Sequence, residues 1–377
     1  MDERKESAAF SAHPSTWEHV TSSMSGFEFP ELAPCIEVKI KRQGEPEMPD
    51  LVVMPDGRAF YFQRPLVSSI FGAVFHSVEG HCSNPHDWRT FLMRSRAEER
   101  PQVAVKMSRL AKMREIPQEN VFREIAVMRH LSEGGGHPHV MSMVTACMSR
   151  THLYVMTPFC ETGDLLKCVV PGKGTGEDKA RRWFRQIFLG LGYMNSKGLF
   201  HHDFSPENVV ISGDGNAAVV MDFGMVHRLQ TDDSGEVVPM RDPQPIGKRR
   251  YMAPEIWTGE EYDGRQIDIW SAGVTLLVCL VGENQWKLPT RTPMEHRDIY
   301  SSDINSYANL EQYGARVMLE RERYTSRMSE AAVDLLCQIL VVDRSLRPRS
   351  AELLTQHPFF TAETAVPGSL TTPYGPL

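Results

Sequence analysis

The part of this chain that most constrains its fold is a pair of short apolar runs, residues 209–211 and 217–221, separated by a glycine-containing turn. Such runs predict two short paired strands. Three polar side chains lie at the ends of these predicted strands: Asp203, Asn208 and Asp222. Strand ends on a rigid scaffold are frequent sites of chemistry, and Mg²⁺ prefers hard oxygen ligands such as carboxylates and amides. A base and two metal ligands at these positions would form a reaction centre.

Each of these residues alone has a simpler interpretation, because an aspartate at a strand end is more often a turn residue than a catalyst. Their joint order and spacing resemble the catalytic loop and the Asp-Phe-Gly motif of the eukaryotic protein kinases. The resemblance implies that Asp203 orients a substrate hydroxyl and accepts its proton. It also implies that Asn208 and Asp222 hold Mg²⁺ beside ATP.

Two motifs nearer the N-terminus fit the same family. Lys106 ends the apolar run Val-Ala-Val-Lys, and in the family this lysine contacts the α- and β-phosphates. Glu124 resembles the helix partner of that lysine. It also shares the apolar face of Val121 and Met128, where a carboxylate is costly unless it is paired. We therefore expect a Lys106–Glu124 ion pair, with a glutamate at the rim of the helix as the alternative.

Motifs towards the C-terminus extend the resemblance over residues 59–360. Residues 251–255, Tyr-Met-Ala-Pro-Glu, resemble the end of a kinase activation segment. Residues 268–273 resemble the buried helix that follows it. Arg347 resembles the arginine that pairs with the glutamate at position 255 in that family.

The fold class implied by the resemblance is α+β, a two-lobed protein-kinase-like fold. A small antiparallel sheet with one key helix forms the N-lobe, and helices dominate the C-lobe. The expected boundaries are an N-lobe at 59–157 and a C-lobe at 158–360. Residues 1–58 are expected to be a partly disordered N-terminal extension and residues 361–377 a flexible tail.

The resemblance also outlines a nucleotide site between the lobes. It implies that Met156 is the gatekeeper, that Thr157 to Phe159 form the hinge that hydrogen-bonds adenine, and that Asp164 lies near the ribose. The expected contacts with ATP are Leu66, Gly72, Val74, Ala104, Lys106, Met156, Thr157, Phe159, Asp164 and Val210. The expected cofactors are ATP and Mg²⁺.

Two features weaken the family pattern. Of the glycines expected in the phosphate-covering loop only Gly72 remains, because Val67 and Ser69 take the other positions. Glycine lets backbone approach a ligand closely, so this change weakens the expected phosphate clamp. His202 replaces an arginine that usually pairs with a phosphorylated activation segment, and neutral imidazole cannot make that charged bidentate contact. We therefore expect activity that does not depend on phosphorylation of the segment.

Ser205 and Lys248 form a further departure from the family. There, a lysine stands at the first position and reaches the γ-phosphate, and a threonine stands at the second. We interpret the two changes as one exchange, in which the flexible stem of Lys248 brings its ammonium to the phosphate from the opposite side. Lys248 is then a catalytic candidate. The alternative places Lys248 in a solvent-exposed basic patch with Arg249 and Arg250.

The implied function is an ATP-dependent kinase that phosphorylates serine or threonine in protein substrates. Residues 205–208 lack the Ala/Arg-containing sequence that is usual in tyrosine kinases. The lost glycines favour an alternative, a pseudokinase that binds nucleotide or partner proteins. The residues retained for chemistry argue against it: Lys106, Glu124, Asp203, Asn208 and Asp222. A small-molecule kinase fits poorly because residues 253–255 are where protein kinases build their peptide platform.

Composition bears on the remaining classes. A net charge of -7 and a sequence pI near 6.1 do not favour nucleic-acid binding, which requires a clustered basic surface. The apolar run at residues 270–282 is too short to cross a bilayer and predicts a buried helix. Seven cysteines without metal-type spacing are typical of a reducing compartment, so we expect a cytoplasmic protein, with the nucleus as an alternative. The sequence leaves the oligomeric state open.

Overall fold

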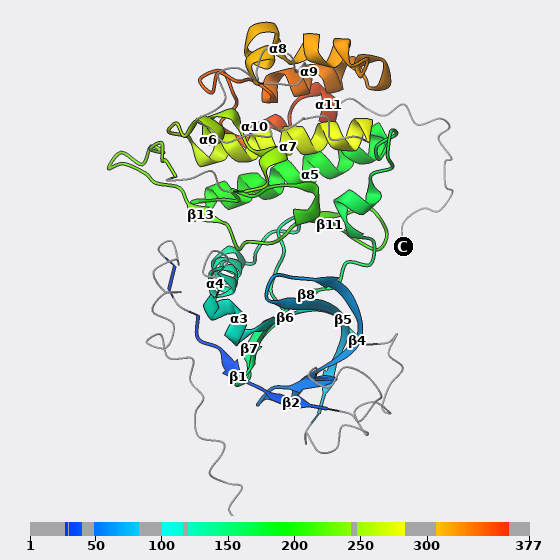
Figure 1. The fold of residues 1–377 in the computed structure, drawn as a ribbon, viewed down its shortest axis with the longest axis vertical. Coiled ribbons are helices and arrows are strands. Elements are labelled where there is room, and N and C mark those ends of the chain that lie inside the picture. The colour runs from blue at the N-terminus through cyan, green and yellow to red at the C-terminus, as the bar shows by residue number, and fades with distance from the viewer. Residues whose placement is uncertain are drawn as a thin grey trace, which may run out of the picture.

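A computed structural model describes residues 27–28, 30–39, 49–82, 100–115, 120–242, 247–282 and 307–361. A strand-rich part, at the bottom of Figure 1, is followed in the chain by a mainly helical part at the top. The helix α4 (Val121–Ser132) lies beside the sheet in this view. This is the α+β organisation in two lobes that the sequence predicts.

One eight-stranded sheet forms the N-lobe. Its strands are β1 (Ala33–Pro34), β2 (Ile36–Val38), β3 (Leu51–Val53), β4 (Arg58–Ser68), β5 (Gly72–His81), β6 (Gln102–Arg109), β7 (Thr145–Met148) and β8 (His152–Pro158). Their spatial order is β1-β7-β8-β6-β5-β4-β3-β2, and neighbours are antiparallel except β1 with β7. Only Cys35 separates β1 from β2 in the chain, yet they stand at opposite ends of this order. The sheet therefore curls until its two ends meet.

Hydrogen bonds to Glu37, on β2, secure this closure. The carboxylate accepts from Tyr154 Oη (2.8 Å), His152 Nδ1 (3.0 Å), Thr151 Oγ1 (3.1 Å) and Ser149 Oγ. Burial alone would raise the pKa of Glu37, but the hydrogen bonds from His152, Ser149 and Tyr154 outweigh it and lower the pKa to about 2. One ionised carboxylate thus joins β2 to β8 and to the turn before it.

The N-lobe sheet begins before residue 59, where the sequence analysis placed the start of the domain. β1, β2 and β3 all precede that position, and the side chains of β3 are fully buried. The sequence predicts a partly disordered extension over residues 1–58, whereas three strands of the sheet lie within it. Strands of two or three residues are too short to show a periodic pattern.

β6 sends alternate side chains to opposite faces of the sheet. Val103, Val105 and Met107 are buried in the core of the N-lobe, whereas Ala104 and Lys106 are half-buried on the other face. Helix α3 (Leu110–Glu115) continues directly from this strand.

Helix α4 begins after Asn120, whose Oδ1 accepts a hydrogen bond from Arg123 N (3.1 Å). The sequence predicts a start at Pro117, which lies outside the described residues. The apolar face that the sequence predicts is buried: Val121, Ile125, Met128 and Leu131. The same helix carries Glu124 towards the sheet.

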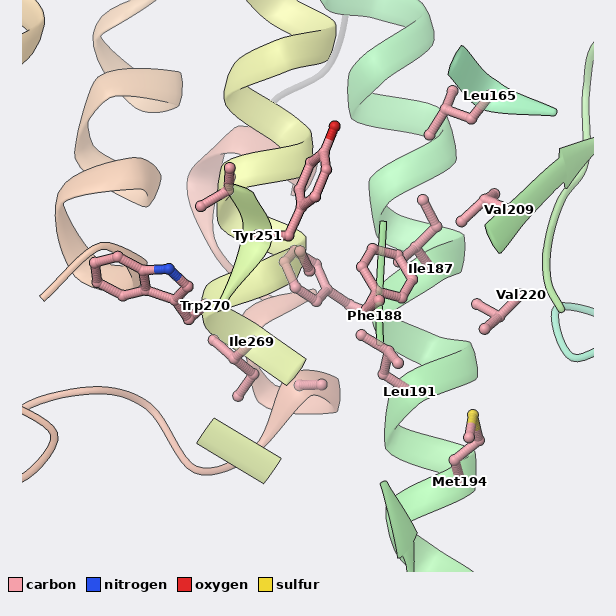
Figure 2. Close-up of a cluster of buried hydrophobic side chains, with 14 of the residues drawn as sticks. Leu165, Ile187, Phe188, Leu191, Met194, Val209, Val220, Tyr251, Ile269 and Trp270 are labelled. Carbon is pink, nitrogen blue, oxygen red and sulfur yellow. The ribbon is translucent and has the colours of Figure 1, made fainter. Parts of the chain in front are cut away.

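The C-lobe contains most of the helices. Its elements are β9 (Gly163–Asp164), α5 (Glu177–Ser196), β10 (Leu199–Phe200), β11 (Val209–Ile211), β12 (Ala218–Val220), β13 (His227–Arg228), α6 (Pro254–Thr258), α7 (Gly264–Val281), α8 (Tyr307–Arg321), α9 (Glu330–Ile339), α10 (Ala351–Leu354) and α11 (Pro358–Thr361). In Figure 2, Ile187 and Phe188 of α5 lie between Trp270 of α7 and Val209 and Val220 of β11 and β12. This packing fixes the two strands whose ends carry Asp203, Asn208 and Asp222.

Within the described residues, α7 has the length and hydropathy of a membrane span. Its mean hydropathy over 18 residues is 1.3, and 94% of that window is buried inside the protein. Trp270 at its centre is 1% exposed. The helix is thus covered by protein, as the sequence analysis expected.

Candidate active site

Asp268, on α7, holds the backbone of the catalytic loop. Its Oδ2 accepts a hydrogen bond from His201 N (2.6 Å) and its Oδ1 accepts one from His202 N (2.9 Å). Burial raises the pKa of Asp268 in spite of these hydrogen bonds. His202 adopts a φ of 69°, which non-glycine residues seldom take. The carboxylate stabilises this backbone conformation and so fixes the position of the next residue, Asp203.

Asp203 is held from two sides. Its Oδ1 accepts a hydrogen bond from Lys248 N (2.7 Å), while Asn208 Nδ2 donates to Asp203 O (2.7 Å) and, at 3.3 Å, to Asp203 Oδ2. Gly247 precedes the lysine with a φ of 103°, and a Cβ there would lie 3.1 Å from His202 O. A glycine at 247 therefore lets the activation segment, residues 222–255, approach the catalytic loop.

The side chain of Lys248 points into the catalytic loop. Its Nζ donates to Ser205 Oγ (2.6 Å) and Asn208 Oδ1 (3.3 Å), and lies 3.8 Å from Asp203 Oδ2 and 3.7 Å from Glu207 Oε2. The contact between positions 205 and 248 is the one that the exchange hypothesis requires. The alternative, in which this lysine joins a solvent-exposed basic patch, does not describe the structure.

Asp222 follows β12 with a φ of 66°. Burial alone would raise the pKa of its carboxyl, but the positive charges of Lys106 and Lys248 help to outweigh burial, and the pKa is lowered. The ionised Asp222 and the amide oxygen of Asn208 are hard oxygen donors, the kind that Mg²⁺ prefers. The residues present therefore fit the magnesium site that the sequence predicts.

Lys106 of β6 and Glu124 of α4 form an ion pair, with Nζ 2.7 Å from Oε2. The Glu124 side chain is 9% exposed, so it does not lie at the helix rim. Arg123 beside it donates to Gly224 O and thereby ties α4 to the Asp-Phe-Gly motif. The sequence does not reveal this role of Arg123, because a basic residue on a helix gives no sign of a partner so distant in the chain.

Several expected ATP contacts share the face of the sheet that carries Lys106. Val74 is the direct cross-strand partner of Lys106, and Ala104 lies two residues away on the same strand. Leu66 and Val210 are half-buried, from β4 and β11. A sheet surface with small or branched side chains beside a lysine can accept a flat base and its phosphates.

Met156 lies on the opposite face, so its prediction as gatekeeper is wrong. It is the cross-strand partner of Val105, and both pack into the core of the N-lobe. Thr157, the partner of Ala104, faces the nucleotide side instead. Residues 153–156 are all apolar and buried, so the sequence contained no alternation that could show which face each side chain takes.

One amide of the predicted hinge, residues 157–159, is already engaged within the protein. The amide of Phe159 donates to Gln102 O (3.3 Å), whereas the amide of Cys160 makes no hydrogen bond within the described part of the chain. Cys160 N is therefore the donor that is available to a ligand. Asp164 is half-buried, and its carboxylate accepts from Lys167 N (3.0 Å) and pairs with Lys167 Nζ (2.7 Å).

Gly72 has a packing role that the sequence did not reveal. A Cβ at this position would lie 2.1 Å from Met107 O, because β5 approaches β6 closely there. Phe71 is 1% exposed and belongs to the hydrophobic cluster that includes Phe122 of α4. The retained glycine is thus explained by strand packing, and its contact with ATP stays a prediction.

Arg347 and Glu255 form a buried ion pair that anchors the C-terminal end of the activation segment in the C-lobe. Arg347 Nη1 lies 2.5 Å from Glu255 Oε1, and Nη2 lies 3.1 Å from Oε2. The arginine also stacks on Trp270, 4.8 Å from the ring centre. This is the pair that the sequence predicts, and its bidentate geometry fixes the end of the segment.

Known proteins match this chain over the same region. A family model for the protein kinase domain matches residues 91–360. The chain is 30% identical over 243 residues to serine/threonine-protein kinase SAPK3 of Oryza sativa subsp. indica, which covers 64% of this chain and 65% of the relative. It is 31% identical over 253 residues to CBL-interacting protein kinase 4 of Oryza sativa subsp. japonica, covering 66% and 49%. It is 32% identical over 240 residues to the probable serine/threonine-protein kinase KCC4 of Saccharomyces cerevisiae, covering 63% and 20%.

These matches span less than two thirds of the length of each relative. The range of the family model includes the Lys106–Glu124 pair, the catalytic loop and the Arg347–Glu255 pair. Sequence, geometry and family model agree over most of the chain. The chain therefore belongs to the protein kinase family.

Proposed function

We propose that this chain is an ATP- and magnesium-dependent protein kinase that phosphorylates serine or threonine. The observation that carries the proposal is the set of hydrogen bonds by which Lys248 and Asn208 hold Asp203. Glu124 orients the ammonium of Lys106, which would bind the phosphates of ATP. The names of the relatives support the serine/threonine class.

Asp203 is the proposed base. Its Oδ1 is engaged by the Lys248 amide at 2.7 Å, whereas the contacts of its Oδ2 are longer, 3.3 Å to Asn208 Nδ2 and 3.8 Å to Lys248 Nζ. Oδ2 is therefore the oxygen that would accept the proton of a substrate hydroxyl. The backbone hydrogen bonds to Asp268 keep this carboxylate in place.

The phosphates would meet positive charge from two sides. Lys106, oriented by Glu124, would contact the α- and β-phosphates, and Lys248 would reach the γ-phosphate. Asn208 and Asp222 would hold Mg²⁺, which would neutralise charge on the phosphates. The peptide would approach over residues 248–255, next to Asp203.

Adenine would bind at the end of β8. The amide of Cys160 would donate to the base, and Thr157 would lie beside it on the nucleotide face. This assignment moves the hinge contact beyond Phe159, whose amide is already bonded to β6.

A pseudokinase, the alternative suggested by the lost glycines, has weaker support. The groups needed for transfer are not merely retained but also bonded to one another around Asp203.

All seven cysteines are free thiols, which supports our proposal of a cytoplasmic location.

The test is transfer of phosphate from radiolabelled ATP to a generic protein or a peptide library, with wild type beside Asp203→Asn. We expect the variant to lose about 10²–10⁴ in rate because it lacks the positioned base, while binding of a fluorescent ATP analogue stays unchanged. Transfer at the wild-type rate by the variant would show that Asp203 is not the base. Absence of transfer by the wild type, with nucleotide still bound, would favour the pseudokinase.

A further inference from the structure

A carboxylate of the activation segment, Asp242, lies against the catalytic loop. The side chain of His202 is fully buried, at 0% exposed, and its Nε2 is 3.1 Å from Asp242 Oδ2. The hydroxyl of Tyr262 donates to the same oxygen. Asp242 is thus held between the catalytic loop and the residues that precede α7.

The backbone around this contact is paired as well. Met240 N donates to Tyr262 O (2.9 Å), and Tyr262 N donates to Met240 O (2.8 Å). Tyr262 is 1% exposed, and its ring centre is 5.9 Å from that of His202. The segment at residues 240–242 is therefore anchored through both its backbone and the Asp242 side chain.

The groups that contact Asp242 favour its ionised form. Burial alone would raise the pKa of Asp242, but His202 and the Tyr262 hydroxyl outweigh it and lower the pKa. His227, on β13, lies 4.8 Å from the His202 ring, and burial, His202 and Arg123 lower the pKa of His227 to about 4. His227 is therefore neutral near pH 7, and Asp242 is the charged group against the imidazole of His202.

This contact joins the two elements that place the catalytic base. His202 directly precedes Asp203 in the catalytic loop. Lys248, which donates its amide to Asp203 Oδ1, follows Asp242 on the activation segment. A fixed distance between His202 and Asp242 therefore constrains both groups that determine the position of Asp203.

We propose that Asp242 is a positioning residue that does the work of a phosphoryl group on the activation segment: its permanent negative charge, bound by His202 and Tyr262, holds the segment against the catalytic loop. The inference rests on the proposed kinase function. It explains why position 202 can be a histidine, because a single imidazole nitrogen can pair with a carboxylate at this distance, whereas a phosphoryl group is better matched by the fork of an arginine.

The experiment uses the full chain after phosphatase treatment and compares Asp242→Ala with wild type. We expect kcat to fall about 10- to 150-fold, the range for a lost charge-assisted hydrogen bond, with little change in KM for ATP. Asp242→Glu should recover part of the loss. Asp233→Ala is the matched control, since Asp233 is an exposed carboxylate on the same segment, and it should behave as wild type.

A double-mutant cycle separates a positioning role from general destabilisation. Asp242→Ala combined with His202→Ala should be little worse than either single variant, because both remove the same contact. Independent, multiplicative losses would overturn the proposal. So would wild-type kcat in Asp242→Ala, or a wild-type enzyme that loses activity on phosphatase treatment.

Amide hydrogen exchange over residues 247–255 keeps the inference testable if the wild type transfers no phosphate. Faster exchange in Asp242→Ala, but not in Asp233→Ala, would support the anchor even then and would place the failure in the proposed function. Unchanged exchange would overturn the anchor. Asp242→Asn replaces the alanine variant if the latter does not fold.

Discussion

Two residues of the catalytic loop that depart from the family pattern, Ser205 and His202, each contact a residue of the activation segment. Lys248 and Ser205 meet at 2.6 Å, so the lysine near the transferred phosphate would come from the activation segment and not from the catalytic loop. His202 and Asp242 meet at 3.1 Å in the same way, one from each element. In both contacts one residue lies in the catalytic loop near Asp203 and the other lies on the activation segment. Each departure from the family pattern in the catalytic loop thus has a contact partner on the activation segment.

The first of these pairs leads to a prediction for Lys248→Ala. Loss of a charge-assisted contact costs about 1.5–3 kcal/mol, so turnover should fall about 10- to 150-fold. Arg250→Ala, an exposed neighbour, is the matched control and should leave the chemical step unchanged. Single-turnover transfer of radiolabelled phosphate measures that step directly.

The reciprocal exchange gives a sharper comparison. Lys248→Thr should lose activity, and Ser205→Lys with Lys248→Thr should recover much of it, since the same two groups then meet with their positions reversed. If Lys248→Thr alone is harmless, its ammonium does not serve the phosphate and the exchange hypothesis fails.

Among the elements, the activation segment is held in place by contacts of its own residues. Its N-terminal half forms a hairpin in which Thr231 pairs with Val237 and Asp232 Oδ1 accepts from Ser234 Oγ (2.6 Å). Its C-terminal half is fixed by Asp242 and by the Glu255–Arg347 pair. The segment is therefore held at several points by groups that belong to the unmodified chain.

Phosphorylation of this segment should accordingly be dispensable. Thr231 and Ser234 are the only serine or threonine residues between positions 222 and 247, and both lie on the exposed hairpin. The double variant Thr231→Ala with Ser234→Ala should keep kcat within about twofold of wild type, as is usual for surface substitutions. A loss of tenfold or more in steady-state assays would show that a phosphoryl group on the hairpin is needed.

The catalytic elements could be read from the sequence because their residues are close together in the chain and have a fixed order. Asp203, Asn208 and Asp222 flank two strands joined by a turn, and the structure has these strands as β11 and β12. The face of β8 could not be read, since residues 153–156 are uniformly apolar, and Met156 was misassigned for that reason. The contact of Asp242 with His202 was also hidden, because it joins positions that no local pattern relates.

For the whole molecule, closure of the N-lobe sheet depends on residues before the predicted domain boundary. Glu37 contributes the side-chain hydrogen bonds at the seam between β2 and β8. Cys35 N adds a backbone bond to Met148 O (3.0 Å). The two ends of the sheet are thus joined by one short stretch of chain.

Glu37 should make this closure sensitive to acid. Its pKa is about 2 in the folded protein and about 4.5 without these contacts, so the folded state binds its proton less readily. Its stabilisation is present above pH 4.5 and is lost as the pH falls towards 2. We expect Glu37→Gln to lower the midpoint of thermal unfolding at pH 7 and the difference from wild type to shrink across that range. Glu320→Gln, on the exposed face of α8, is the control, and an equal shift in both variants would contradict the assignment.

The pairing of β1 with β7 also has a consequence for the order in which the protein folds. Ala33 is the partner of Cys147, so the ribosome releases one strand long before it makes the other. Closing so long a loop carries an entropic cost that only late, cooperative contacts repay. During synthesis the sheet formed by β2 to β6 therefore has an unpaired edge until β7 and β8 are made. Such an edge can form hydrogen bonds with other chains. The seam that completes the N-lobe is the last part of it that can form.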